Sequence, residues 1–216
     1  VDATVTYVQG NSEPFRFTDE QTGLELETDA IRARMEAAIL SLSPGTEALQ
    51  PKEISPNVYR AELENATVLR ARVVMPLSGS AAAQENAALA AAQFQNVRLE
   101  AGERLSFNQT VGLRTDESGY VQAEEPAYGQ DISGIGGGVC QVCSTIYNIV
   151  LRVPAVIEDM NWHSQGGVSY LPAGFDATVS DTKDMIFRNI LPYDVRIEFE
   201  SLDGVMTAFM FRDYEE

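Results

Sequence analysis

The chain's two cysteines, Cys140 and Cys143, lie two and five residues after the last of three consecutive glycines at 136–138. A helical apolar pattern begins at the same place and covers 139–153. Glycines let the backbone approach a ligand closely, and the first turn of a helix offers unpaired N–H groups and the positive end of the helix dipole. A thiol placed there ionises more readily and becomes a nucleophile. We therefore expect covalent chemistry at this segment.

The helical period separates the two thiols. At about 100° per residue, Cys143 lies inside the apolar stripe, about 40° from Val139, whereas Cys140 lies at its edge, at about 100°. Gln141, Ser144 and Asn148 occupy the polar side. We expect Cys143 to face the core as a small hydrophobic residue and Cys140 to lie on the flank, open to a groove beside the glycines.

If Cys140 is the nucleophile, backbone amides of the same turn are candidates to bind the oxyanion that its attack creates. The amides around Gly138 and Gln141 are the first candidates, and Gly136 and Gly137 would line the same turn.

A cysteine nucleophile also needs a base, and His163 is the only histidine in the chain. A catalytic imidazole needs an orienting acceptor. Asp176 is the candidate for that acceptor, with a backbone carbonyl as the alternative, and Tyr170 lies between them in sequence and could line the site. The candidate catalytic residues are thus Cys140, His163 and Asp176.

Other interpretations of the glycine–cysteine segment remain open. It could be a tight turn packed under a sheet, with two inert thiols. Cys-x-x-Cys at a helix start is also the thioredoxin-type redox signature, although no βαβ pattern surrounds it. Nucleotide binding is disfavoured because no Lys-Ser/Thr follows the glycines. With two Cys and one His, a zinc site would need a carboxylate as fourth ligand, so we expect neither a metal nor another cofactor.

The composition limits the partners. A net charge of −17 disfavours nucleic acid, because phosphate binding needs a basic surface. The chain holds no run of about 18 apolar residues that could span a bilayer. Because it begins at Val1 rather than Met, we expect a mature fragment whose signal peptide or anchor has been removed, so that any membrane attachment would be through that missing part.

The elements around the motif predict an α+β fold. The first part reads as a small unit with strands over 3–8 and 15–17 and a helix that is capped by Thr28 or Asp29 and stops at 43–45. The apolar stripe of this helix comprises Ile31, Met35, Ile39 and Leu42. The best boundary follows residue 76, which gives domains 1–76 and 77–216.

The second part contains an alanine-rich helix over 81–95 and a hairpin formed by 97–99 and 105–107. A strand over 120–128 precedes the cysteine helix. The tail has a short strand over 184–187 and an antiparallel hairpin over 194–211, whose turn carries the Asp203-Gly204 signal. In that hairpin Val195, Ile197 and Phe199 share one face.

These motifs resemble the VanW family, in order and spacing, over roughly residues 80 to 200. The segments that carry the resemblance are 101–108, 111–115, 119–120, 136–142, 144–145, 147–148, 163–164, 168–170, 174, 176–179 and 187–189. Residues 15–49 look, more weakly, like the peptidoglycan-binding domain that often precedes a VanW domain. The resemblance implies a mixed α+β VanW domain after a small peptidoglycan-binding-like unit.

The resemblance implies cell-wall work outside the cytoplasm, because some members are regarded as L,D-transpeptidases that use the VanW cysteine. The family usually has Ser where this chain has Cys143, which argues against a redox pair. Its usual Arg is replaced here by Phe175, so a substrate carboxylate would need another arginine, for which Arg114 and Arg188 are candidates. The expected activity is a cysteine-dependent peptidoglycan acyltransferase on stem peptides. The alternatives are a non-catalytic wall-binding or vancomycin-resistance accessory module, and a thiol–disulfide protein.

Overall fold

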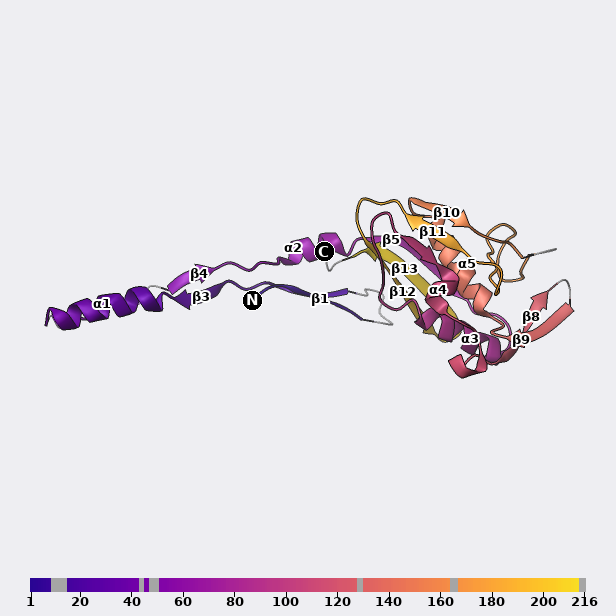
Figure 1. The fold of residues 1–216 in the computed structure, drawn as a ribbon, viewed down its shortest axis with the longest axis horizontal. Helices are drawn as coiled ribbons and strands as arrows, with labels where there is room; N and C mark the ends of the chain where they lie inside the picture. Colours follow the sequence, from indigo (N-terminus) through magenta and orange to yellow (C-terminus); the bar gives the residue numbers. More distant parts are fainter. Residues whose placement is uncertain (9–14, 43–44, 47–50, 128–129, 164–166, 214–216) are drawn as a thin grey trace. The chain divides into compact units, whose positions relative to one another are not determined.

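The computed structural model describes residues 1–216 except 9–14, 43–44, 47–50, 128–129, 164–166 and 214–216. The chain separates into two compact units, with the division between Asn65 and Ala66. Figure 1 shows the helices and strands in chain order. The predicted α+β class is confirmed, because both units combine helices with antiparallel strands.

The first unit consists of two short antiparallel ladders and two helices. Strand β1 (Thr4–Tyr7) pairs with β2 (Phe15–Thr18), and β3 (Gly23–Leu26) pairs with β4 (Pro51–Ile54). Helix α1 (Thr28–Leu40) follows β3, and α2 (Arg60–Ala66) follows β4. The predicted helix is present, but its N-cap is Glu27, which makes no side-chain capping bond, rather than Thr28 or Asp29. Its predicted stop lies partly outside the described residues.

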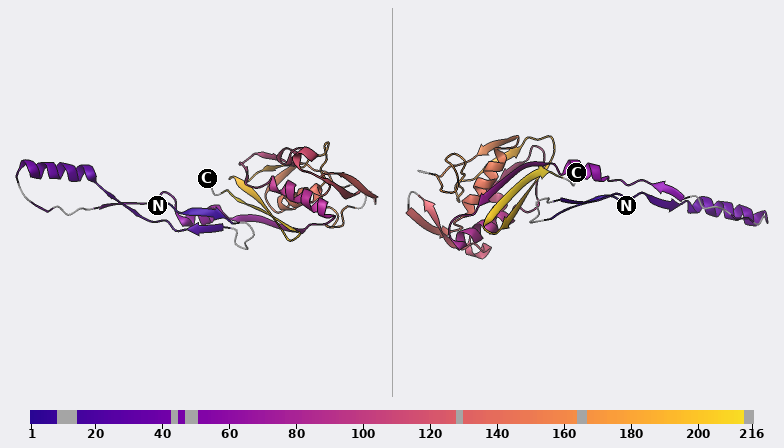
Figure 2. Two further views of the ribbon diagram at one scale, coloured as in Figure 1. Left: turned by 90° about the horizontal axis from the view of Figure 1, so that it is seen from below. Right: turned by 180° about the vertical axis from the view of Figure 1, so that it is seen from behind.

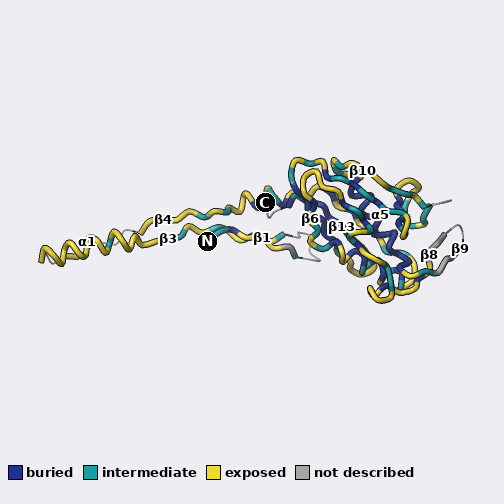
Figure 3. Tube along the Cα trace, in the orientation of Figure 1, coloured by how far each residue is buried: buried dark blue, intermediate teal, exposed yellow. Residues whose placement is uncertain are grey.

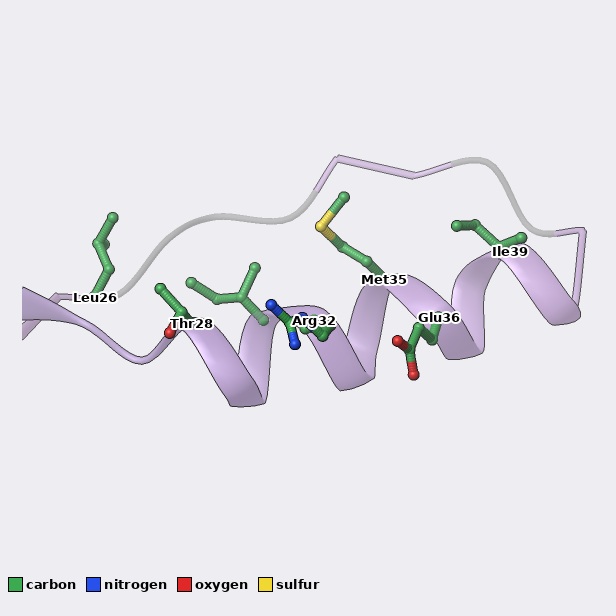
Figure 4. A pocket seen from close by; sticks show the side chains of 7 residues that line it. Leu26, Thr28, Arg32, Met35, Glu36 and Ile39 are labelled. Carbon is green, nitrogen blue, oxygen red and sulfur yellow. The ribbon is translucent and has the colours of Figure 1, made fainter.

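The apolar stripe predicted for α1 exists, but it is not buried. Helix α1 has no buried residue, and Figure 3 colours it as exposed along most of its length. Met35 and Ile39 project from one side of the helix (Figure 4), where they line a shallow hollow together with Leu26. A helical period therefore predicted the secondary structure here but not the packing.

The second unit is built on a four-stranded antiparallel sheet in the order β5–β13–β12–β6. Its strands are β5 (Leu69–Pro76), β6 (Val97–Leu99), β12 (Val195–Leu202) and β13 (Val205–Arg212). The predicted hairpin is confirmed: β12 and β13 pair in full, and Asp203 and Gly204 have φ angles of 49° and 73°, as a type I′ turn requires. Because β5 pairs with β13, residues 69–76 belong to this sheet.

Two helices cover one face of this sheet (Figures 1 and 2): α3 (Ala81–Ala92) and α5 (Val139–Val150). The Ser80 side chain caps α3 by accepting a hydrogen bond from the Ala83 amide. Small alanine side chains let α3 lie close to its neighbours. All twelve residues of α5 are buried, and the helix ends at Val150, three residues before the predicted end.

A three-stranded sheet in the order β10–β11–β7 completes the core, with strands β7 (Arg104–Ser106), β10 (Ala155–Asp159) and β11 (Ile186–Asn189). The predicted hairpin over 97–107 is wrong, since β6 pairs with β12 and β7 pairs with β11. The intervening turn is held instead by a hydrogen bond from the Gly102 amide to the Asn189 carbonyl. The chain crosses between two sheets here, which a local turn signal cannot reveal.

The remaining elements flank the cysteine helix. Helix α4 (Phe107–Val111) and a 3₁₀ turn, η1 (Asp116–Ser118), lead to a hairpin of β8 (Gln122–Ala127) and β9 (Gln130–Ile135). The predicted strand corresponds to β8, while β9 was not predicted. No helix within the described ranges is long and apolar enough to cross a membrane.

Candidate functional site

The glycine run places the start of α5 against its neighbours. Gly138 is the N-cap with φ of +103°, and a Cβ there would lie 2.1 Å from the Ala83 carbonyl oxygen of α3. A Cβ on Gly137 would lie 2.7 Å from the Ala123 carbonyl oxygen of β8. Contacts this short are impossible for a side chain, so both glycines are required by packing alone. Neither glycine needs a bound ligand to explain it.

Gly136 serves a related purpose next to Arg114. Its φ is +82°, and a Cβ would lie 3.1 Å from the Arg114 Cβ. The Arg114 guanidinium donates to Asn108 Oδ1 at 2.9 Å and lies 3.6 Å from an Asp181 oxygen. Only 11% of the Arg114 side chain is exposed, against 96% of that of Asp181. A mostly buried cation thus has a loosely held, fully solvated partner.

The predicted oxyanion role of the Gln141 amide is wrong, because this N–H donates to the Gly138 carbonyl at 3.0 Å. The Gln141 side chain is also occupied. Its Oε1 accepts from the Ser78 amide at 2.8 Å, and its Nε2 donates to the Ser78 carbonyl at 3.1 Å. Gln141 therefore fastens the start of α5 to the segment that follows β5.

The two thiols lie in the predicted order of burial. Cys143 has no exposed surface, and burial raises the pKa of its thiol well above the usual range, with a further increase from the charges of Cys140 and Asp184. Cys140 retains 9% exposure. The prediction that Cys140 lies in an open groove is wrong, because its sulfur lies 3.5 Å from Thr178 Oγ1 and 3.6 Å from the Val179 carbonyl oxygen.

The segment that covers Cys140, residues 174–179, runs along the polar side of α5. Side chains from successive turns of α5 form hydrogen bonds with the backbone of the 174–179 segment. These bonds explain why the predicted polar face of α5 is buried. The bonds are Tyr147 Oη to the Gly174 carbonyl (3.5 Å), Asn148 Nδ2 to the Phe175 carbonyl (2.7 Å), Ser144 Oγ to the Ala177 carbonyl (3.1 Å) and the Ala177 amide to Ser144 Oγ (3.0 Å).

This segment also holds the histidine. The Asp176 carboxylate accepts from the His163 amide at 2.9 Å and lies 2.8 Å from His163 Nδ1. Burial works to raise the pKa of Asp176, but the two bonds from His163 outweigh it and hold the pKa below its ordinary value. In the tautomer in which Nδ1–H donates to Asp176, Nε2 keeps a lone pair and can accept a proton. The predicted pair of His163 and Asp176 is therefore present.

Cys140 and His163 both contact the 174–179 segment, Cys140 through Thr178 and His163 through Asp176. Thr178, two positions after Asp176, donates its amide to the Asn161 carbonyl at 2.8 Å, so the stretch that ends in His163 runs beside the 174–179 segment. The Thr178 hydroxyl faces the Cys140 sulfur. The 174–179 segment thus contacts the imidazole through Asp176 and the thiol through Thr178, two residues later.

Tyr170 is close to the same group of side chains. Burial raises the pKa of its phenol, and the charges of Cys140, Cys143 and Asp176 raise it further against a smaller opposing effect of Ser144. Tyr170 also packs against the hydrophobic core. The phenol is therefore neutral at ordinary pH and can serve as a hydrogen-bond donor beside the thiol.

Arg188 has a different environment from the one predicted. It lies on β11, where its Nε donates to Glu158 Oε1 at 2.7 Å. Arg104 on β7 pairs with the same carboxylate. These contacts lower the pKa of Glu158 and balance the charge of Arg188 on the surface of the three-stranded sheet. Of the two candidate arginines, Arg114 is the one whose charge acts on the cysteine helix.

The contact of Thr178 with Cys140 was not predicted from the sequence. A single threonine in an irregular segment gives no periodic signal; the available signals were its position two residues after Asp176 and its place in the 176–179 segment of the family resemblance. Within the residues that the structure describes, no three His, Cys, Asp or Glu side chains gather closely enough to hold a metal ion.

Comparison with known proteins gives two matches. A family model described as "VanW like protein" matches residues 82–211. The chain is 35% identical over 135 residues to the "Uncharacterized protein YoaR" of Bacillus subtilis (strain 168), an alignment that covers 62% of this chain and 44% of that protein. The chain therefore spans less than half the length of this curated relative. No solved structure matches.

Proposed function

We propose that this chain, which belongs to the VanW family, is a cysteine-dependent acyltransferase of the L,D-transpeptidase type that acts on peptidoglycan stem peptides. The observation that carries the proposal is that the 174–179 segment holds Asp176 against His163 and Thr178 against Cys140. A thiol, an imidazole and an orienting carboxylate are the groups that covalent acyl transfer needs.

In the proposed reaction, His163 Nε2 takes the proton of the Cys140 thiol, and the thiolate attacks the carbonyl carbon of the third residue of a donor stem. The amide bond to the terminal D-amino acid breaks, His163 protonates the leaving amine, and a thioester remains on Cys140. The amine of a second stem then attacks the thioester, which forms the crosslink and releases the thiol. Attack by water instead would make the enzyme a carboxypeptidase.

Two further side chains suit the proposed substrate. The pairing of Arg114 with the exposed Asp181 is worth little in water, so a substrate carboxylate can replace Asp181 as the partner of this guanidinium. Tyr170 offers a neutral phenol as a donor to the oxyanion, a role that the engaged Gln141 amide cannot take. No cofactor is needed for these steps.

A second candidate, a non-catalytic wall-binding or accessory module, is favoured by one observation. Cys140 is 9% exposed, and the segment above it is bonded to α5 at several points. A catalytic thiol must be reached by its substrate, so the acyltransferase proposal requires the 174–179 segment to shift when the donor binds. A binding module requires no such movement.

The two candidates differ in what they do to a soluble donor. Purified protein would be incubated with muropeptides that carry tetrapeptide stems, and release of the terminal D-amino acid and of crosslinked dimers would be followed by mass spectrometry. The acyltransferase proposal expects both products from the parent and from Cys143→Ser, and neither from Cys140→Ala. Binding of muropeptides by the parent and by Cys140→Ala, without release of any product, would instead establish the accessory module.

The partners and location belong to the same proposal. Peptidoglycan stem peptides as substrates place the protein outside the cytoplasm, at the cell wall. The first unit would then be the peptidoglycan-binding-like domain that the sequence resemblance implies. A pull-down of the parent with purified wall material, compared with a chain that starts at Ala66, would test whether this unit contributes to binding.

A further inference from the structure

Thr178 contacts one member of the proposed catalytic pair and is bonded to the stretch that carries the other. Its Oγ1 lies 3.5 Å from the Cys140 sulfur, while its backbone amide donates to the Asn161 carbonyl at 2.8 Å. The residue is therefore fixed through its main chain to the stretch that carries His163.

The direction of the hydrogen bond between Thr178 and Cys140 follows from the second contact of the sulfur. The Val179 carbonyl oxygen, 3.6 Å from the sulfur, can only accept a hydrogen bond, so the thiol S–H is the donor in this contact. With the S–H directed at that carbonyl, the Thr178 hydroxyl is left as the donor toward sulfur. When the thiol loses its proton, its hydrogen bond to the Val179 carbonyl is lost. The hydrogen bond from the Thr178 hydroxyl to the sulfur then becomes charge-assisted and stronger.

We propose that Thr178 is a positioning residue that holds the Cys140 sulfur and stabilises its thiolate by donating a hydrogen bond from Oγ1. This inference rests on the proposed function and deepens it, because it names the group that activates the nucleophile in place of the backbone amides of the glycine turn. The thiol proton passes to His163 Nε2, and the Thr178 hydroxyl keeps its own proton throughout.

Several titratable groups belong to the same part of the structure. Cys143 of α5 and Tyr170 of the preceding loop lie near enough to Cys140 for its charge to act on them, and the pair of His163 and Asp176 lies on the two stretches that run beside each other. Farther out, Asp184 and Arg114 act on the buried Cys143 with opposite signs. A substitution of Thr178 by Val changes none of these groups, so its effect can be assigned to the hydroxyl.

The test measures the rate of alkylation of Cys140 by iodoacetamide from about pH 5 to 10, in a Cys143→Ser background so that one thiol reacts. A hydrogen bond to a charged acceptor is stronger than one to a neutral acceptor, but sulfur is a weak acceptor. We therefore expect Thr178→Val to raise the midpoint of the pH profile by about one unit, which makes alkylation about tenfold slower at pH values below the midpoint. Thr178→Ser keeps the hydroxyl and should keep the parental midpoint.

Thr145→Val is the matched control, because Thr145 is a buried threonine of the same helix whose hydroxyl donates to the Gln141 carbonyl at 2.7 Å. Its midpoint should equal that of the parent. An unchanged midpoint in Thr178→Val, or equal shifts in the Val and Ser variants, would overturn the proposal. If the Val variant does not fold, Thr178→Ala removes the hydroxyl without adding bulk and is judged by the same criterion.

The experiment separates this inference from the proposed function, since alkylation needs no muropeptide. A shifted midpoint in Thr178→Val, together with a parent that releases no D-amino acid, would support the positioning role and reject the transpeptidase. An unshifted midpoint in Thr178→Val, together with a parent that releases the D-amino acid and crosslinked products, would reject the positioning role and support the transpeptidase.

Discussion

The glycines at the start of α5 allow a quantitative test of the packing account. Two costs can be separated by substitution with Ala: a left-handed φ, worth about 1–2 kcal/mol, and overlap with a neighbour, worth about 1–3 kcal/mol. Gly102 has only the first cost, with φ of +84° and open space around it, and Gly137 has only the second. Gly138 has both, and Gly134 has neither.

We predict that Gly138→Ala lowers the free energy of unfolding by about 2–5 kcal/mol, the sum of the two costs. Gly102→Ala should lower it by about 1–2 kcal/mol and Gly137→Ala by about 1–3 kcal/mol. Gly134→Ala should be nearly neutral or slightly stabilising. The overlap at Gly138 is with backbone, a carbonyl oxygen 2.1 Å away, so a side-chain rearrangement cannot relieve it.

The assay is urea unfolding followed by near-ultraviolet circular dichroism, which reports the packed aromatic core of the second unit. That core contains Phe94, Phe107 and Phe199, all fully buried. The reasoning would be refuted if Gly138→Ala cost no more than Gly102→Ala, because the close approach of α3 would then have no energetic consequence. The glycines would in that case be better explained by a ligand than by packing.

Three further outcomes follow from the site. Asp176→Asn should abolish donor cleavage and lower the free energy of unfolding at pH 7. Because the pKa of Asp176 is lowered in the folded protein, the difference in stability between parent and variant should shrink as the pH falls through this folded pKa. Urea titrations at pH 7 and about pH 3 would measure it. Native protein should react with iodoacetamide at one thiol and urea-unfolded protein at two, since Cys143 has no exposed surface; equal labelling in both states would contradict the burial. Ser144→Ala leaves both polar groups of Ala177 without the Ser144 hydroxyl as their partner. The substitution should lower the free energy of unfolding by about 1–3 kcal/mol and speed alkylation of Cys140. An unchanged or slower rate of alkylation would show that the 174–179 segment does not limit access.

The regular parts of this fold could be predicted because their signals are local. The apolar stripe of α5 separated Cys143 from Cys140, and alternation with an Asp-Gly turn predicted the hairpin of β12 and β13. The pairing of His163 with Asp176 needed only the rule that a catalytic imidazole requires an acceptor. In each case the residue types determine the contact without knowledge of the tertiary structure.

The parts that could not be predicted depend on contacts between distant segments. The same Ala-Gly turn signal fits a hairpin and a crossover, and only pairing with β11 and β12 decides between them. The glycine run is equally compatible with backbone amides that bind a ligand and with close packing against neighbouring backbone. The positions of the Ala83 and Ala123 carbonyls, which leave no room for a Cβ, show that close packing requires these glycines. Likewise, Arg188 carries the charge expected of a substrate anchor, but Glu158, thirty residues earlier, takes that charge.

The most direct test of the central claim, that Cys140 is the nucleophile oriented by His163 and Asp176, is mass spectrometry of the intact protein after brief incubation with tetrapeptide muropeptides. The account predicts an added mass equal to the donor without its terminal D-amino acid, mapped to Cys140 by digestion and present also in Cys143→Ser. Absence of this adduct under conditions in which the donor is cleaved, or its location on any other residue, would contradict the account.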